Sequence, residues 1–158
     1  MKTIYKQRLL KLAAFLRKVP RKHFDLQVIT NVETTDIYGW NLTLDKILVQ
    51  IDSLRKVGKK CKRLNCKTAA CAVGWCPSVF PRVFKWNDNG SVVSVKDENE
   101  YDFLVAERFF GLAEYSSTYL FRPESYRPGH RGPKSVAGRI EKLVKNNGMI
   151  PRYKDYIL

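Results

Sequence analysis

The four cysteines constrain the fold of this chain most, because they all fall within residues 61–80 and recur at every fifth position. They are Cys61, Cys66, Cys71 and Cys76. The residues around the last two are small, namely Ala69, Ala70, Ala72 and Gly74. Alanine, glycine and cysteine are common in protein interiors and let a neighbouring helix approach closely. We therefore expect a short buried helix over Ala69–Trp75, capped by Thr68 and broken by Pro77, at the centre of the molecule.

The cysteine spacing argues against a metal site. Structural zinc sites usually take paired ligands about two residues apart, so that one tight turn aims both sulfurs at the ion. Here four residues separate neighbouring cysteines, and a five-residue step turns a helical side chain by about 500°. The cysteines of a helix would then point to different faces. We predict no metal ligands and no cofactor, and we expect the thiols to stay reduced inside a cell.

A cysteine nucleophile is the enzymatic alternative. Cys66 stands in a basic stretch beside Lys67, which favours the thiolate, and His130 would supply a base if the fold brings it close. The sequence has no Ser-His-Asp elbow, phosphate-binding glycine loop or paired-carboxylate motif. We therefore predict that the protein is not an enzyme and has no catalytic residue.

Apolar residues recur with helical spacing near both ends of the chain. Residues 4–18 carry such a stripe, and Pro20 ends this helix. The stripe consists of Tyr5, Leu9, Leu12, Ala13 and Leu16. The last helix is capped by Ser135 and ends at Asn147. Its buried face is expected to hold Val136, Ile140, Leu143 and Val144. A further helix is expected over Leu44–Val57.

The middle of the chain predicts a hairpin followed by another helix. An Asn-Gly pair at residues 89–90 lies between two apolar runs within residues 84–95, which is typical of a two-residue hairpin turn. Asp97 and Glu100 then form a capping box for a helix that ends at Gly111. The buried face of this helix would be Phe103, Ala106, Phe109 and Phe110.

With a short helix over Tyr115–Phe121, these elements predict a mainly α fold. We expect a single compact helical domain over residues 1–158, with five or six helices and a small β-hairpin. Residues 1–22 would form its basic N-terminal helix, and residues 149–158 would form a tail. No apolar run reaches the roughly 18 residues that a membrane span needs, so we expect no membrane span.

The charge of the chain favours polyanionic partners. The 29 lysines and arginines exceed the 15 acids, which gives a net charge of +14. The cations gather in residues 2–22, 55–67 and 122–134, whereas seven acids lie within residues 88–114. The candidate nucleic-acid contacts are Lys59, Lys60, Lys62, Arg63, Lys67, Arg122, Arg127, Arg131 and Lys134. Three aromatic residues stand near the last group, as stacking on bases would require, namely Tyr119, Phe121 and Tyr126.

Several short motifs resemble those of a loosely defined group of small phage and prophage proteins. The matching segments are CKTAACAVGW, ERFFGL, the YLF at the end of a short helix, and VAGRIEKLV. They fall within residues 24–147. The corresponding positions include Cys66, Thr68, Cys71, Gly74, Trp75, Phe110, Gly111, Leu112, Leu120 and Phe121. The chain departs from the group by Lys67, where glycine is usual, and by its additional Cys61 and Cys76. The resemblance implies a phage-encoded accessory protein of mainly helical fold and supplies no catalytic residue.

Together these features predict a phage protein that acts in the cytoplasm of the host bacterium. We expect a basic surface that binds DNA, RNA or a nucleoprotein assembly by charge neutralisation. Two alternatives remain open from the sequence. One is a protein-binding inhibitor of a host enzyme or anti-phage defence factor, steered by an acidic host surface. The other is a structural component of the virion.

Overall fold

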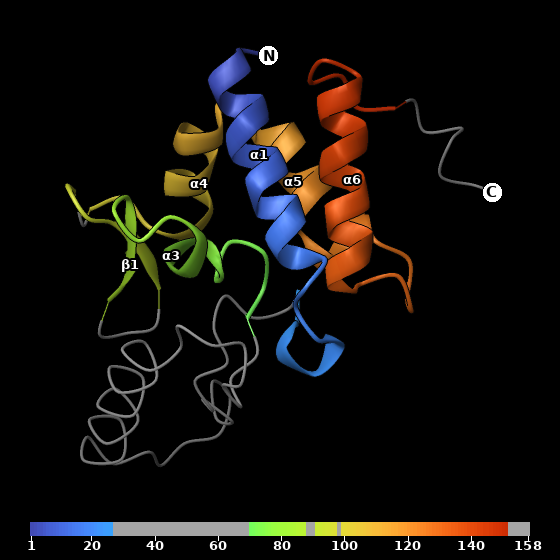
Figure 1. Cartoon of the computed structure of the whole chain (residues 1–158), viewed down its shortest axis with the longest axis horizontal. Helices are drawn as coiled ribbons and strands as arrows, with labels where there is room; N and C mark the ends of the chain where they lie inside the picture. Colours follow the sequence, from blue (N-terminus) through green and yellow to red (C-terminus); the bar gives the residue numbers. More distant parts are fainter. Residues whose placement is uncertain (27–69, 88–90, 98, 152–158) are drawn as a thin grey trace.

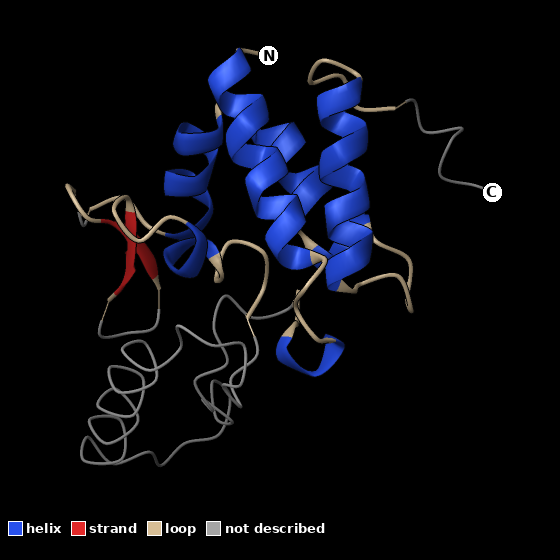
Figure 2. Ribbon diagram, viewed as in Figure 1, coloured by secondary structure: helices blue, strands red, loops and turns tan. Residues whose placement is uncertain are grey.

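The computed structural model describes residues 1–26, 70–87, 91–97 and 99–151. The helices are α1 (Thr3–Leu16), α3 (Cys76–Val79), α4 (Asp102–Phe110), α5 (Glu114–Phe121) and α6 (Pro133–Lys145), with 3-10 turns η1 (Arg21–His23) and η2 (Pro123–Ser125). Two short strands, β1 (Phe84–Trp86) and β2 (Val92–Ser94), are the remaining regular elements of the described residues (Figure 2). The predicted mainly α architecture with a small hairpin is confirmed, whereas the helix expected over Leu44–Val57 lies outside the described residues.

Helices α1 and α6 run antiparallel and side by side through the middle of the molecule (Figure 1). The apolar stripes read from the sequence form their contact. The fully buried residues of the pair are Leu9, Leu12, Ala13, Leu16, Val136, Ala137, Ile140 and Leu143. The predicted cap of α6 is wrong, because the helix starts at Pro133 with Gly132 as its N-cap, upstream of Ser135. Proline suits this first position because its fixed φ is helical and its missing N–H has no intrahelical partner there.

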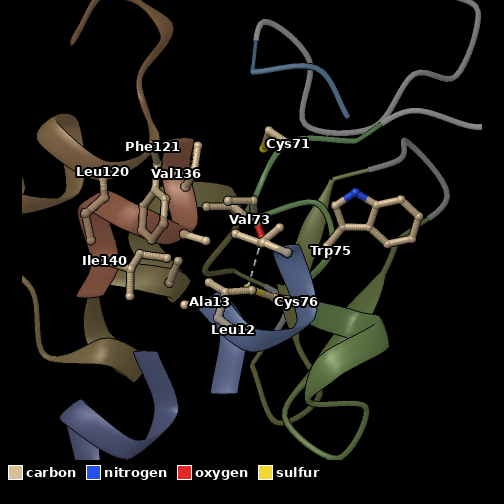
Figure 3. Packing of buried hydrophobic residues seen from close by; sticks show 14 of the residues in the cluster. Leu12, Ala13, Cys71, Val73, Trp75, Cys76, Leu120, Phe121, Val136 and Ile140 are labelled. Carbon is tan, nitrogen blue, oxygen red and sulfur yellow. Dashed lines mark hydrogen bonds between the residues drawn. The ribbon is translucent and has the colours of Figure 1, made fainter. Parts of the chain in front are cut away.

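The segment around Cys71 is central, as predicted, but it does not form the predicted helix. Residues 72–75 make turns, and α3 begins only at Cys76 with Pro77 in its first turn. Two features account for the late start of the helix. Ala70 pairs in a parallel bridge with Phe24, which keeps the chain extended there. Pro77 favours the first turn of a helix and not its end. Figure 3 shows this segment packed between α1 and the ends of α5 and α6.

The hairpin forms as predicted, with Phe84, Lys85 and Trp86 paired with Ser94, Val93 and Val92. Helix α4 starts at Asp102, so the capping box predicted at Asp97 and Glu100 is wrong. Asp102 has a positive φ of 52° and its carboxylate accepts a hydrogen bond of 2.9 Å from the N–H of Val92. The hairpin therefore fixes the start of α4.

The end of α4 at Gly111 is confirmed. Gly111 has a φ of 62°, and the N–H of Leu112 bonds back to the carbonyl of Glu107 at 2.9 Å. This left-handed glycine is a common helix terminator. The buried face of α4 differs from the prediction, since Val105 is buried as well and Phe103 and Phe109 are only half-buried.

Candidate nucleic-acid interface

The predicted contact residues divide into two sets. Five of them lie outside the described residues, namely Lys59, Lys60, Lys62, Arg63 and Lys67. The other four are described: Arg122, Arg127, Arg131 and Lys134. Arg122 is exposed, but its guanidinium lies 4.2 Å from the ring centre of Phe103 on α4. The other three lie on the loop before α6 and in its first turn.

The structure brings this loop against the end of the N-terminal basic segment. Nη1 of Arg21, in η1, donates hydrogen bonds to the carbonyl of Arg131 at 2.8 Å and to that of Phe24 at 3.3 Å. The side chain of Arg21 also lies so close to Gly132 that a Cβ there would stand 3.5 Å from Cδ of Arg21. Two basic segments more than 100 residues apart in the chain thus meet at one end of the α1–α6 pair (Figure 1).

We call this surface the basic end and define it by Lys18, Lys22, Arg127, Arg131 and Lys134. All except the half-buried Arg131 are exposed. Within the described ranges, none of the five forms an ion pair with a carboxylate. Glu141, about two turns after Lys134 on α6, is bound by Arg17 through two hydrogen bonds of 2.8 and 2.5 Å. The positive charges of the basic end are therefore open to an anionic partner.

Two further features raise the positive potential at this place. The Nε of Arg131 is buried and has no hydrogen-bond partner. Helix α6 also begins here, and the N-terminal end of a helix carries a partial positive charge. The sequence predicts a helix start near this place, at Ser135, but not the burial of Arg131, which depends on how the loop folds against Arg21.

The cations in the middle of α1 interact differently. The guanidinium of Arg8 lies 4.1 Å from the ring centre of Phe109 and donates a 2.7 Å hydrogen bond to the carbonyl of the same residue. The amine of Lys11 lies 5.1 Å from the ring centre of Phe80. These cations cover an aromatic cluster formed by Phe80, Phe84, Phe109, Phe110 and Phe121. Only the later part of the segment 2–22 contributes to the basic end.

The aromatic residues expected to stack on bases are buried, so this part of the prediction is wrong. Phe121 is fully buried, and Tyr119 and Tyr126 are nearly so. The hydroxyl of Tyr126 donates a 2.6 Å hydrogen bond to the carbonyl of Leu120. The guanidinium of Arg139 lies 3.6 Å from the ring centre of Tyr126 and 4.7 Å from that of Tyr119. These rings hold the loop to α5 and α6 and are not available to a ligand.

The described thiols are packing groups. Burial raises the pKa of Cys71 to about 11 and raises the pKa of Cys76 well above its ordinary value. The thiol of Cys76 donates to the carbonyl of Ala72 at 3.6 Å (Figure 3). A neutral buried thiol is a poor nucleophile. Cys66, the residue considered as a nucleophile, lies outside the described residues, and His130 is exposed.

Sequence reasoning did not nominate Lys18, Lys22 or Arg21. They were counted only within the basic segment 2–22, because the contact of Arg21 with Arg131 joins positions too far apart for any local pattern to reveal. In the parts of the chain that the structure describes, no group of three histidine, cysteine or carboxylate side chains is placed to bind a metal ion. None of the described helices combines the length and apolar character that crossing a bilayer requires.

Comparison with known proteins assigns the chain to no family. No protein-family model matches the chain, and neither a curated protein nor a solved structure is significantly similar to it.

Proposed function

We propose that this is a phage-encoded accessory protein that binds nucleic acid through its basic end, inside the infected bacterium. The observation that supports the proposal is the contact of Arg21 with Arg131, which joins two basic segments in one surface. The side chains around this contact are cations without carboxylate partners among the described residues. The basic stretch at 55–67 precedes Ala70 in the chain, and its lysines and arginines remain further proposed contacts.

Binding would act by charge neutralisation. Each lysine or arginine that neutralises a phosphate releases condensed counterions, and this release is the main favourable contribution to sequence-independent binding. For a duplex, the logarithm of the binding constant falls with the logarithm of the salt concentration with a slope of about −0.9 per neutralised phosphate. The exposed cations of the basic end alone would therefore contribute a slope of roughly −3 to −4.

The test is a salt series on the purified full-length chain with a fluorescent DNA. The double variant Lys22→Gln, Lys134→Gln should weaken binding and reduce the salt slope by about 2. The matched control is Lys142→Gln, Lys145→Gln, which removes two exposed lysines from the opposite end of α6. Equal effects of the two double variants would show that net charge, and not the basic end, governs binding. A flat salt response of the unaltered chain would refute the proposal.

A second candidate function is the binding and inhibition of a host protein. The observation that favours it is a set of exposed apolar side chains on and beside α4, namely Val95, Tyr101 and Leu104. Large apolar groups on a surface often mark protein contacts. Recovery of one stoichiometric host protein after nuclease treatment, lost in Leu104→Glu, would favour this function over nucleic-acid binding.

A further inference from the structure

Proteins hold nucleic acids with two different sets of side chains. Sites for single strands combine a cationic groove with exposed aromatic rings, on which successive bases stack. Contacts to the backbone of a duplex need only cations and hydrogen-bond donors, because the bases are already stacked on one another. A basic surface that exposes aromatic rings beside its cations therefore fits a single strand. One that exposes cations without such rings fits a duplex.

Among the described residues, the phenylalanine, tyrosine and tryptophan rings near the basic end lie in the core or pack against it, whereas the imidazole of His130 is exposed. Phe24 follows η1 and is 3% exposed. Trp75 is 5% exposed, and its indole N–H donates a 3.2 Å hydrogen bond to the carbonyl of His23. Tyr119 and Tyr126 are held by Arg139, as described above. The most exposed tyrosine side chains of the described residues are Tyr101, which precedes α4, and Tyr115, in the first turn of α5.

The cations of the basic end are carried by backbone that is fixed on both sides of the contact. Lys22 lies within η1. The last residue of this turn is His23, and its carbonyl accepts a 3.2 Å hydrogen bond from the N–H of Ala70. Arg127 lies at the start of a turn closed by the N–H of His130, at 3.0 Å. The N–H groups of Ser135 and Val136 both bond to the carbonyl of Gly132, which fixes the turn that carries Lys134.

We infer that the basic end binds the phosphate backbone of a double helix and does not bind the bases of a single strand. The inference rests on the proposed function and names the form of nucleic acid that the surface fits. A duplex carries one charge per about 1.7 Å of its axis in a fixed arrangement. An array of cations held on fixed backbone fits such a rigid polyanion, whereas a flexible single strand loses more conformational freedom when it is bound.

The experiment compares duplex DNA with each of its single strands, of equal length and mixed sequence, as competitors for the full-length chain. The duplex is expected to bind more tightly, with equal affinity for unrelated sequences. The salt slope should be about −0.9 per contact on the duplex and about −0.7 on the single strand. A single strand with abasic sites in place of half its bases should bind as well as the intact strand.

The variant Lys22→Gln, Lys134→Gln locates the contact. It should weaken duplex binding uniformly across sequences, while the control Lys142→Gln, Lys145→Gln retains the preference for the duplex. Equal or tighter binding of the single strand, or a loss of affinity with the abasic strand, would overturn the inference and leave the proposed function standing. Failure to bind either form at low salt would remove the proposed function, and the inference with it.

Discussion

Two regions of the described structure are rich in lysine and arginine, and they use these residues in opposite ways. Beside the aromatic cluster, Arg8 and Lys11 lie over phenylalanine rings, and Arg8 also bonds to a carbonyl of α4. At the basic end, Lys22 and Lys134 are exposed and form no ion pair with the described acids. A count of net charge treats both regions alike. Only the packing shows which cations stabilise the fold and which are open to a ligand.

The difference has an energetic consequence. A cation over an aromatic ring contributes about 0.5–2 kcal/mol, depending on how far it is removed from water. Exposed charges contribute little to stability, because solvent screens them. Changes near the aromatic cluster should therefore lower the free energy of unfolding, and changes at the basic end should alter binding alone.

The largest effect is expected for Gly111→Ala. A Cβ at Gly111 would overlap the ring of Tyr5 on α1, and the φ of 62° is unfavourable for alanine. Strain of about 1 kcal/mol adds to an overpacking cost of about 1–3 kcal/mol. We expect the free energy of unfolding, measured in urea, to fall by roughly 2–4 kcal/mol.

Gly129→Ala is the matched control for this substitution, because it lies in the loop of the basic end. Gly129 also has a positive φ, of 87°, but a Cβ there would meet nothing within 4 Å. Its cost should be confined to backbone strain, about 1 kcal/mol. If both variants lose the same stability, the contact between Gly111 and Tyr5 does not contribute and the contrast between the regions weakens.

A smaller effect is expected for Arg139→Lys. The guanidinium of Arg139 donates to the carbonyl of Tyr119 at 2.8 Å and to both Ser125 Oγ, at 3.0 Å, and the carbonyl of Ser125. Lysine keeps the charge but lacks the planar fork that makes these bonds together. Leaving a part-buried carbonyl unsatisfied costs about 1–3 kcal/mol. The exposed Arg127→Lys should leave thermal unfolding unchanged, and equal losses would contradict the assignment of Arg139 to the packed cations.

The sequence predicted the elements that local patterns specify. The stripes of α1 and α6, the pairing of β1 with β2 and the stop at Gly111 depend on side-chain period or on backbone preference, and these act over a few residues. The Asn-Gly turn itself, at residues 89–90, lies outside the described residues. The start of α3 and of α4 was missed because contacts distant in the chain, from Ala70 to Phe24 and from Asp102 to Val92, override the local caps.

The candidate site was predicted only in part, for a similar reason. Arg127 and Lys134 were identified by charge, but charge does not distinguish them from Arg122, which packs on Phe103. The sequence favours Tyr119 and Tyr126 as stacking residues because they stand near cations. The same pattern occurs where a cation packs on a buried aromatic ring. In the structure, the guanidinium of Arg139 packs on both buried rings, so these tyrosines belong to the second case.

The smallest effect concerns two carboxylates, Asp102 at the start of α4 and Glu141 on α6. Their contributions to the free energy of unfolding should change with pH in opposite directions. Burial raises the pKa of Asp102, although its hydrogen bonds with Val92 and Ser91 oppose the shift. The native state therefore binds this proton more tightly than the unfolded chain, and stability falls as pH rises through the interval between the ordinary and the raised pKa. Arg17 lowers the pKa of Glu141, so the stability from that pair falls as pH decreases from the ordinary to the lowered value.

Asp102→Asn and Glu141→Gln separate the two contributions. Asparagine keeps an acceptor for the N–H of Val92 and tolerates a positive φ, so it should remove the loss of stability with rising pH. The change at neutral pH should be less than about 1 kcal/mol, because solvent screens a half-exposed carboxylate. Glu141→Gln should remove the loss at acid pH and leave the other slope intact. Urea unfolding across the acid range measures both slopes, and the same sign for the two variants would mean that burial does not govern Asp102.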